Sequence, residues 1–222
     1  MSSGNFEIQE YHHARHFDDA EHEYDSAKQG MWLFLVSEVL MFGAIFVGYG
    51  IYYQLYPEAF EAGAGQMKLM WGTINTAVLI GSSFTVAEAI RCVQMDQLKK
   101  AAMYVYITIG CGLAFMVIKG IEYSAKFSHG FFPGRWFAPT EGYEQFAAIP
   151  KLDMYFGFYY TMTGLHALHV IFGLCGLIWA LVKIHKGTIH SKNYMPIEGA
   201  GLFWHLVDLV WIFLFPVLYI VG

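Results

Sequence analysis

The sequence predicts an all-α protein, a polytopic membrane bundle of five transmembrane helices, and two observations carry the prediction. Hydrophobic residues make up 56% of the 222 positions and charged residues only 14%, whereas about a quarter of a typical soluble domain is charged. In addition, five apolar segments each reach the length of about 20 residues that a helix needs to cross a bilayer core. They are residues 31–53, 69–92, 101–123, 154–184 and 201–222.

The first apolar segment, residues 31–53, has aromatic residues near both ends, which is typical of the membrane–water interface. Glu38 lies well inside it, about 10 Å deep at the helical rise per residue. An ionisable side chain inside a bilayer costs about 2.5–3.5 kcal/mol on insertion scales, so it normally faces protein or water. We therefore expect Glu38 to avoid the lipid.

The second and third segments carry polar groups of two kinds. Asn75 shares a helical face with Ser82, and such groups typically bond to neighbouring helices or to their own carbonyls, so we expect helix contacts rather than catalysis. Lys119 and Glu122 lie near the far end of the third segment. We expect Lys119 to extend toward the headgroups and to form a local ion pair of modest energy with Glu122.

The fourth segment, residues 154–184, is long enough to be tilted, and His166 and His169 lie near its middle. The connection before it, residues 124–153, combines prolines and glycines with aromatic residues, which predicts an ordered interfacial loop. In the fifth segment His205 and Asp208 share one helical face. That face requires partners from other helices.

Glu38, His205 and Asp208 fall in the same predicted half of the bilayer, so we expect them to form a buried polar cluster. Two interpretations remain open. The side chains could hydrogen-bond to each other and fix helix packing, or a buried carboxylate beside a histidine could relay protons. The packing interpretation is favoured because one polar cluster does not make a continuous path.

The N-terminal segment, residues 1–29, is polar and acidic and predicts a cytoplasmic tail, followed by the five-helix domain at residues 30–222. It lacks the basic-then-apolar order of a cleavable signal peptide. Four histidines among its carboxylates could bind a divalent metal weakly, but a solvated surface segment is favoured. These histidines are His12, His13, His16 and His22.

Five spans place the two termini on opposite sides of the membrane. Cytoplasmic loops carry the excess of lysine and arginine. The tail and the loops after the second and fourth spans hold Arg15, Lys28, Arg91, Lys99, Lys100, Lys183, Lys186 and Lys192, and the other side holds Lys68, Lys119, Lys126, Arg135 and Lys151. This asymmetry predicts that the N-terminus is inside and the C-terminus outside.

Composition also excludes several classes. A net charge of -5 and the lack of a basic run argue against nucleic-acid binding. Cys92, Cys111 and Cys175 form no CxxC pair and are interpreted as small buried apolar residues rather than metal ligands. A carrier would predict broken spans, yet Pro216 is the only proline within a span.

Haem ligation needs paired histidines on two helices at equal depth. By helical rise, His205 lies about 5 Å and His169 about 22 Å from the cytoplasmic edge. We therefore expect this chain to bind neither haem nor another metal. A membrane haem anchor and a proton-coupled carrier remain as alternatives of a different class.

Five motifs in order resemble subunit III of haem–copper terminal oxidases, in the bacterial five-helix form of the cytochrome c oxidase subunit III family. They are GMWLFLVSEVLMF at residues 30–42, NTAVL at 75–79, KGIEY at 119–123, GLHALHV at 164–170, and WHxxDxxW at 204–211 with Glu198 upstream. Any one motif is weak, but the five in this order are specific. The resemblance covers nearly everything from Lys28 to Gly222.

The resemblance implies a subunit without a redox centre that packs beside catalytic subunit I and subunit II, which hold haem and copper, in a bacterial inner-membrane complex. The complex reduces dioxygen and pumps protons in aerobic electron transport, and it could join a respiratory supercomplex. Subunit III is expected to stabilise the catalytic subunit, support proton uptake and bind phospholipid. The positions that match the family are Glu38, Asn75, Lys119, Glu122, His166, His169, Glu198, His205 and Asp208.

This sequence departs from the seven-helix form of the family because it starts at what would be the third helix. In the longer form lipids lie in a cleft between the first two helices and the rest, so the cleft is in doubt here. Five-helix forms also occur in quinol oxidases and in a relative near nitric oxide reductase. Glu198 and the Lys119–Glu122 run favour the cytochrome c branch.

Overall fold

The computed structural model describes residues 18–221. Its described part is all-helical, apart from one isolated bridge between His190 and Asn193. Five helices are long and apolar enough to cross a membrane, which confirms the predicted fold class. The predicted histidine cluster at His12, His13 and His16 lies outside the described residues.

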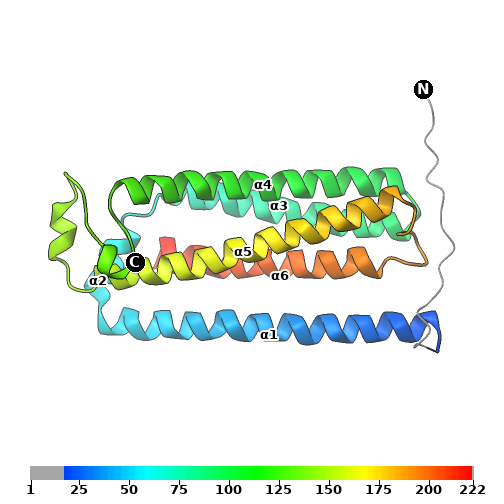
Figure 1. Ribbon diagram of the computed structural model, residues 1–222, viewed down its shortest axis with the longest axis horizontal. Helices are drawn as coiled ribbons and strands as arrows, with labels where there is room; N and C mark the ends of the chain where they lie inside the picture. Colours follow the sequence, from blue (N-terminus) through cyan, green and yellow to red (C-terminus); the bar gives the residue numbers. More distant parts are fainter. Residues whose placement is uncertain (1–17, 222) are drawn as a thin grey trace, which may run out of the picture.

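The five long helices lie side by side along the long axis of the molecule (Figure 1). They are α1 (Ala20–Leu55), α3 (Leu69–Gln94), α4 (Leu98–Ser128), α5 (Leu152–His185) and α6 (Met195–Tyr219), and a short α2 (Pro57–Ala64) follows α1. α3 packs against α4 and α6, and α5 packs against α4 and α6. α1 lies at the edge, where it contacts α6 and, to a smaller extent, α5.

All five long helices extend beyond the apolar segments, α1, α4 and α6 the furthest, because the residues that cap a helix are polar and hydropathy does not mark them. α1 begins at Ala20, so its first ten residues fall within the expected tail. The Asp19 carboxylate caps it by accepting a hydrogen bond from the His22 N–H at 2.7 Å. α6 likewise begins at Met195 with Pro196 in its first turn, six residues before the expected start.

The connection between α4 and α5 is ordered, as expected, although it is shorter because α4 continues to Ser128. It contains two 3₁₀ turns, Gly134–Trp136 and Glu144–Ala148. Phe131 is buried and stacks on Phe156 of α5 with ring centroids 4.8 Å apart. Aromatic packing therefore holds this loop against the bundle.

Another contact ties together the two loops at the opposite end of the bundle. Asp96, in the α3–α4 turn, accepts hydrogen bonds from the Ser191 backbone N–H at 2.9 Å and from the Ser191 hydroxyl at 2.7 Å. These bonds stabilise the carboxylate and lower the pKa of Asp96 below its usual value. The α3–α4 and α5–α6 connections thus lie together.

The centre of the bundle is packed around Trp204 of α6, which is fully buried. Its ring lies against Gly112 of α4 and Gly173 of α5: a Cβ at these glycines would lie 2.6 Å and 2.8 Å from ring atoms. The indole N–H donates to the Ser82 hydroxyl of α3 at 3.0 Å. One side chain therefore sets how closely α4, α5 and α6 approach.

We predict that Gly112→Ala destabilises the folded chain by about 1–3 kcal/mol, the usual cost of overpacking a tight core. The added methyl would meet Trp204 and also Leu174, at 2.8 Å. Gly110→Ala, on the same helix, is the matched control because nothing lies within 4 Å of its Cβ. Denaturant unfolding followed by circular dichroism measures the free energy of unfolding of both variants. Equal stability of the two variants would show that Trp204 does not pack tightly against Gly112.

Candidate functional site

A buried carboxylate–histidine pair joins α1 to α5 at the middle of both helices. The Glu38 Oε2 lies 2.8 Å from the His169 Nε2, and the two side chains are 15% and 10% exposed. Phe42 and Phe203 pack their rings against the imidazole at 5.2 Å and 6.1 Å. Aromatic side chains therefore flank the imidazole, and only a small part of either side chain is exposed.

Hydrogen-bond geometry places two protons on this pair. The His169 Nδ1 lies 2.8 Å from the Leu165 carbonyl oxygen, which can only accept, so Nδ1 carries a proton. The contact between Nε2 and the Glu38 carboxylate then needs a second proton between the two groups. The pair therefore shares one proton across the contact between the imidazole and the carboxylate.

The structure does not bring Glu38 to His205 and Asp208, so the expected three-residue cluster is wrong. The His205 Nδ1 lies 2.6 Å from the Ser83 hydroxyl of α3. Asp208 of α6 lies near Ser82 and Ser83, which both belong to α3. His205 and Asp208 share a helical face as expected, but that face packs on α3. Glu38 of α1 instead contacts His169 of α5.

Asp208 is only 3% exposed, and neither of its carboxyl oxygens has a hydrogen-bond partner in the described part of the chain. The hydroxyls of Ser82 and Ser83 bond to the Leu79 carbonyl and to the His205 ring, respectively. The Asn75 side-chain amide is likewise fully buried without a partner among the described residues. The expected helix contact through the Asn75 amide is therefore not formed.

The estimated depths of the histidines are also wrong. The His166 Nε2 donates to the Val207 carbonyl oxygen of α6 at 3.1 Å, and His169 packs on Phe203, so His205 lies at a level between these contacts. The estimate failed because α6 starts before the apolar segment does. His205 and His169 face different partners, and the expectation that this chain binds no haem stays a prediction.

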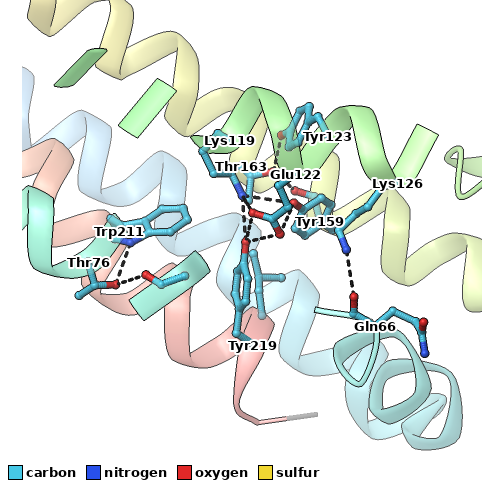
Figure 2. A network of polar contacts seen from close by, with 12 residues as sticks. Gln66, Thr76, Lys119, Glu122, Tyr123, Lys126, Tyr159, Thr163, Trp211 and Tyr219 are labelled. Carbon is cyan, nitrogen blue, oxygen red and sulfur yellow. Dashed lines mark hydrogen bonds and ion pairs between the residues drawn. The ribbon is translucent and has the colours of Figure 1, made fainter. Parts of the chain in front are cut away.

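Lys119 points into the bundle and not toward the headgroups, which corrects the expected position of its side chain. Figure 2 shows its ammonium group among Glu122, Tyr159 and Tyr219. The Lys119 Nζ donates to the Glu122 Oε2 at 3.0 Å and to the Tyr219 and Tyr159 hydroxyls at 2.9 Å and 3.2 Å. Both side chains of the ion pair are 5% exposed.

The Glu122 carboxylate is satisfied by the same tyrosines. Tyr159 donates to the Oε1 at 3.0 Å, and the Tyr219 hydroxyl lies 2.7 Å and 2.8 Å from the two carboxylate oxygens. Lys126 lies nearby and donates to the Gln66 carbonyl oxygen at 3.2 Å (Figure 2). The network joins α4, α5 and α6 near one end of the bundle. Its two tyrosines, Tyr159 and Tyr219, were not singled out from the sequence.

Glu198 joins two helices at the opposite end of the bundle from the Lys119–Glu122 network. Its Oε2 accepts a hydrogen bond from the Tyr24 hydroxyl at 2.7 Å, and its Oε1 lies 3.4 Å from the Lys28 Nζ. These contacts attach the start of α6 to the first turns of α1. The described residues contain no group of three or more side chains that could hold a metal ion.

An apolar cavity of about 560 Å³ opens between α1 and α5. Gly48 of α1 and Gly157 of α5 lack side chains that would fill it. The other lining residues are Ala44, Ile45, Gly134, Asp153, Met154, Phe158 and Thr161. Sequence reasoning did not predict this cavity.

Comparison with known proteins identifies the family of this chain. A family model described as cytochrome c oxidase subunit III matches residues 140–222. The cytochrome c oxidase subunit 3 of Thermostichus vulcanus is 31% identical over 91% of this chain and 91% of its own length. The chain belongs to the cytochrome c oxidase subunit III family.

Other members of the family differ in their named complexes. The cytochrome c oxidase subunit 3 of Alkalihalophilus pseudofirmus is 28% identical over 87% of this chain and 85% of its own length. The cytochrome bo(3) ubiquinol oxidase subunit 3 of Pseudomonas aeruginosa is 25% identical over 92% of this chain and 90% of its own length. Membership of the subunit III family therefore assigns this chain to an oxidoreductase complex.

We predict that Lys119→Met or Glu122→Gln alone destabilises this subunit III chain by about 3–5 kcal/mol, because each leaves a buried charge without its partner. The double variant should lose less than the sum of the two single losses. Glu88→Gln, which removes an exposed ion pair with Arg91 at 3.2 Å, is the control and should cost less than about 1 kcal/mol. Additive losses in denaturant unfolding would show that the two groups act independently.

Proposed function

We propose that this chain is the non-catalytic subunit III of a proton-pumping haem–copper oxygen reductase of the cytochrome c oxidase type. Its relatives are named as subunits of cytochrome c or quinol oxidases. In this proposal haem and copper are held by catalytic subunit I and by subunit II, and this chain stabilises the catalytic subunit. The complex could join a respiratory supercomplex in a bacterial inner membrane.

Support for a role in proton uptake comes from the Glu38–His169 pair. It joins a carboxylate to an imidazole within the bundle, and ionisable groups inside a membrane protein commonly belong to proton relays. Glu38 belongs to α1, whose apolar window has the lowest buried share of the five described spans, 11%. A partner subunit packed on α1 would therefore lie close to this pair.

An orientation with the N-terminus inside agrees with how the ends of the bundle are built. The first turns of α1 contact Glu198 at the start of α6, and the α3–α4 turn contacts the α5–α6 loop. These elements gather at one end of the molecule (Figure 1). They carry Lys28, Lys99, Lys100, Lys183, Lys186 and Lys192, which supports a cytoplasmic location for that end.

Phospholipid is a further proposed ligand, and the cavity between α1 and α5 supports it. The cavity is apolar and borders the exposed α1, as an acyl-chain site would require. Residues of α1 and α5 and of the following loop line the cavity, and its outer wall would be formed by another subunit or by the bilayer. No cofactor is proposed for this chain itself.

The alternative is subunit III of a quinol oxidase or of the relative near nitric oxide reductase. A relative named as a probable quinol oxidase subunit, from Staphylococcus epidermidis, is 26% identical, against 31% for the cytochrome c oxidase subunit of Thermostichus vulcanus. The electron donor binds elsewhere in either complex. The identity therefore favours the cytochrome c branch without depending on any residue of this site.

Purification of the tagged chain in mild detergent tests the proposal. We expect it to co-purify with a large haem- and copper-containing subunit, and oxygen uptake with reduced cytochrome c should exceed uptake with quinol. A Soret band from the chain alone would favour a membrane haem anchor, and proton-coupled uptake by the chain alone in liposomes would favour a carrier. Purification without a haem–copper partner would overturn the oxidase assignment.

We predict that Glu38→Ala leaves the initial rate of oxygen reduction near that of the unchanged complex but shortens the time for which the complex stays active. The reason is that the substitution removes one half of the proton-holding pair. Oxygen consumption recorded over many turnovers measures both quantities. Glu88→Gln serves as the control because Glu88 pairs with Arg91 and not with a histidine.

Two results would argue against a role in proton uptake. Immediate loss of assembly in Glu38→Ala would assign the pair a purely structural role. An unchanged active lifetime would count against both roles.

A further inference from the structure

Asp208 of α6 is a buried titratable group that belongs neither to the Glu38–His169 pair nor to the Lys119–Glu122 network. Its side chain is 3% exposed, and both carboxyl oxygens lack a hydrogen-bond partner in the described part of the chain. None of the ion pairs within residues 18–221 includes it. Among these residues the carboxyl group therefore has neither a counter-ion nor a hydrogen-bond donor.

The groups around this carboxyl come from several helices, and none of them is a lysine or an arginine. Ser82 and Ser83 of α3 lie beside it, and Cys111 of α4 is within its electrostatic reach. On α5, the His166 Nε2 donates to the carbonyl oxygen of the residue that precedes Asp208. An ionised carboxylate here would be an uncompensated charge inside a membrane span, which is strongly unfavourable.

Hydrogen-bond directions also favour a protonated carboxyl. The Ser82 hydroxyl donates its one hydrogen to the Leu79 carbonyl oxygen at 2.7 Å. The Ser83 hydroxyl lies 2.6 Å from the His205 Nδ1 and donates to it when that nitrogen carries no proton. Each serine oxygen can then accept a hydrogen bond but has no hydrogen left to donate. A carboxylate can only accept, whereas a protonated carboxyl can donate to the Ser83 oxygen.

We propose that Asp208 is a proton-binding site that exchanges its proton through Ser83 and His205. The carboxyl group makes no hydrogen bond that a rotation toward Ser83 would break. In the exchange step the Asp208 O–H bond breaks and its proton bonds to the Ser83 oxygen, while the Ser83 hydroxyl proton passes to the His205 Nδ1. The step leaves an Asp208 carboxylate and a His205 imidazolium, so the total charge is unchanged.

The three residues lead from the interior of the bundle toward its surface. Asp208 is buried, whereas Ser83 and His205 are both partly exposed. This site joins α3 to α6, while the Glu38–His169 pair joins α1 to α5. It is a property of this chain and does not rest on the proposed oxidase function.

Infrared spectroscopy at neutral pH tests the bound proton in the full chain, together with any subunits that accompany it. We expect the carbonyl stretching band of protonated carboxyl groups to lose one component in D208N. D153N is the matched control and should lose none, since Asp153 at the start of α5 is partly exposed. D208E keeps a carboxyl group and should keep the component at a shifted frequency.

Transfer into deuterated buffer tests the route. Deuteration of the Asp208 carboxyl shifts its band, and we expect this shift to develop at least severalfold more slowly in S83A than in the unchanged chain. The reason is that S83A removes the hydroxyl between Asp208 and His205. T85A is the matched control on the same helix, because the Thr85 hydroxyl bonds to Thr108 and not to His205.

Two results would overturn the proposal. If neither D208N nor D208E changed the band, Asp208 would be ionised and would hold no proton. If S83A and the unchanged chain exchanged at the same rate, the proton would not pass through Ser83. Circular dichroism shows which variants are folded, and D208E decides the first question should D208N not fold.

Discussion

The buried ion pair between Lys119 and Glu122 constrains how α4, α5 and α6 meet. A lone charge in the bilayer interior is strongly unfavourable, and even a paired one is tolerated only when its remaining hydrogen-bonding capacity is filled. Tyr159 of α5 and Tyr219 of α6 fill it, with four donor–acceptor distances between 2.7 Å and 3.0 Å around the carboxylate. Since each tyrosine belongs to a different helix, a shift of either helix along its axis would leave a charge unsatisfied.

Polar contacts also explain how α1 stays attached although little of it is buried. Its apolar window has the lowest buried share of the five spans, so dispersion contributes little. Instead, hydrogen bonds hold it along its length: Tyr24 to Glu198, Glu38 to His169, and Tyr49 to the Val217 carbonyl at 3.0 Å. In lipid, where no water competes for these groups, such contacts specify register better than apolar packing does.

The bundle therefore separates two tasks. Trp204 and its glycine neighbours determine the distance between helices, because a close-packed slot admits no added atoms. The Lys119–Glu122 network determines the register of α4, α5 and α6. The Glu38–His169 pair lies apart from both tasks, on the least covered helix, and it is the group of this chain best placed to act with a partner subunit in the proposed complex.

The sequence by itself determined the five spans, the all-α class and the family, because hydropathy and ordered motifs are local properties of the chain. It also placed Glu38, His166, His169 and Asp208 inside the spans, but it did not identify Lys126 and His190 as buried. The side chains that these residues contact were not predictable from the sequence. Whether His205 meets Glu38 or Ser83, and whether Lys119 points to headgroups or to Tyr219, depends on helix rotation and on where α6 begins. Only the tertiary structure decided these pairings, since helical periodicity says which residues share a face but not which helix that face meets.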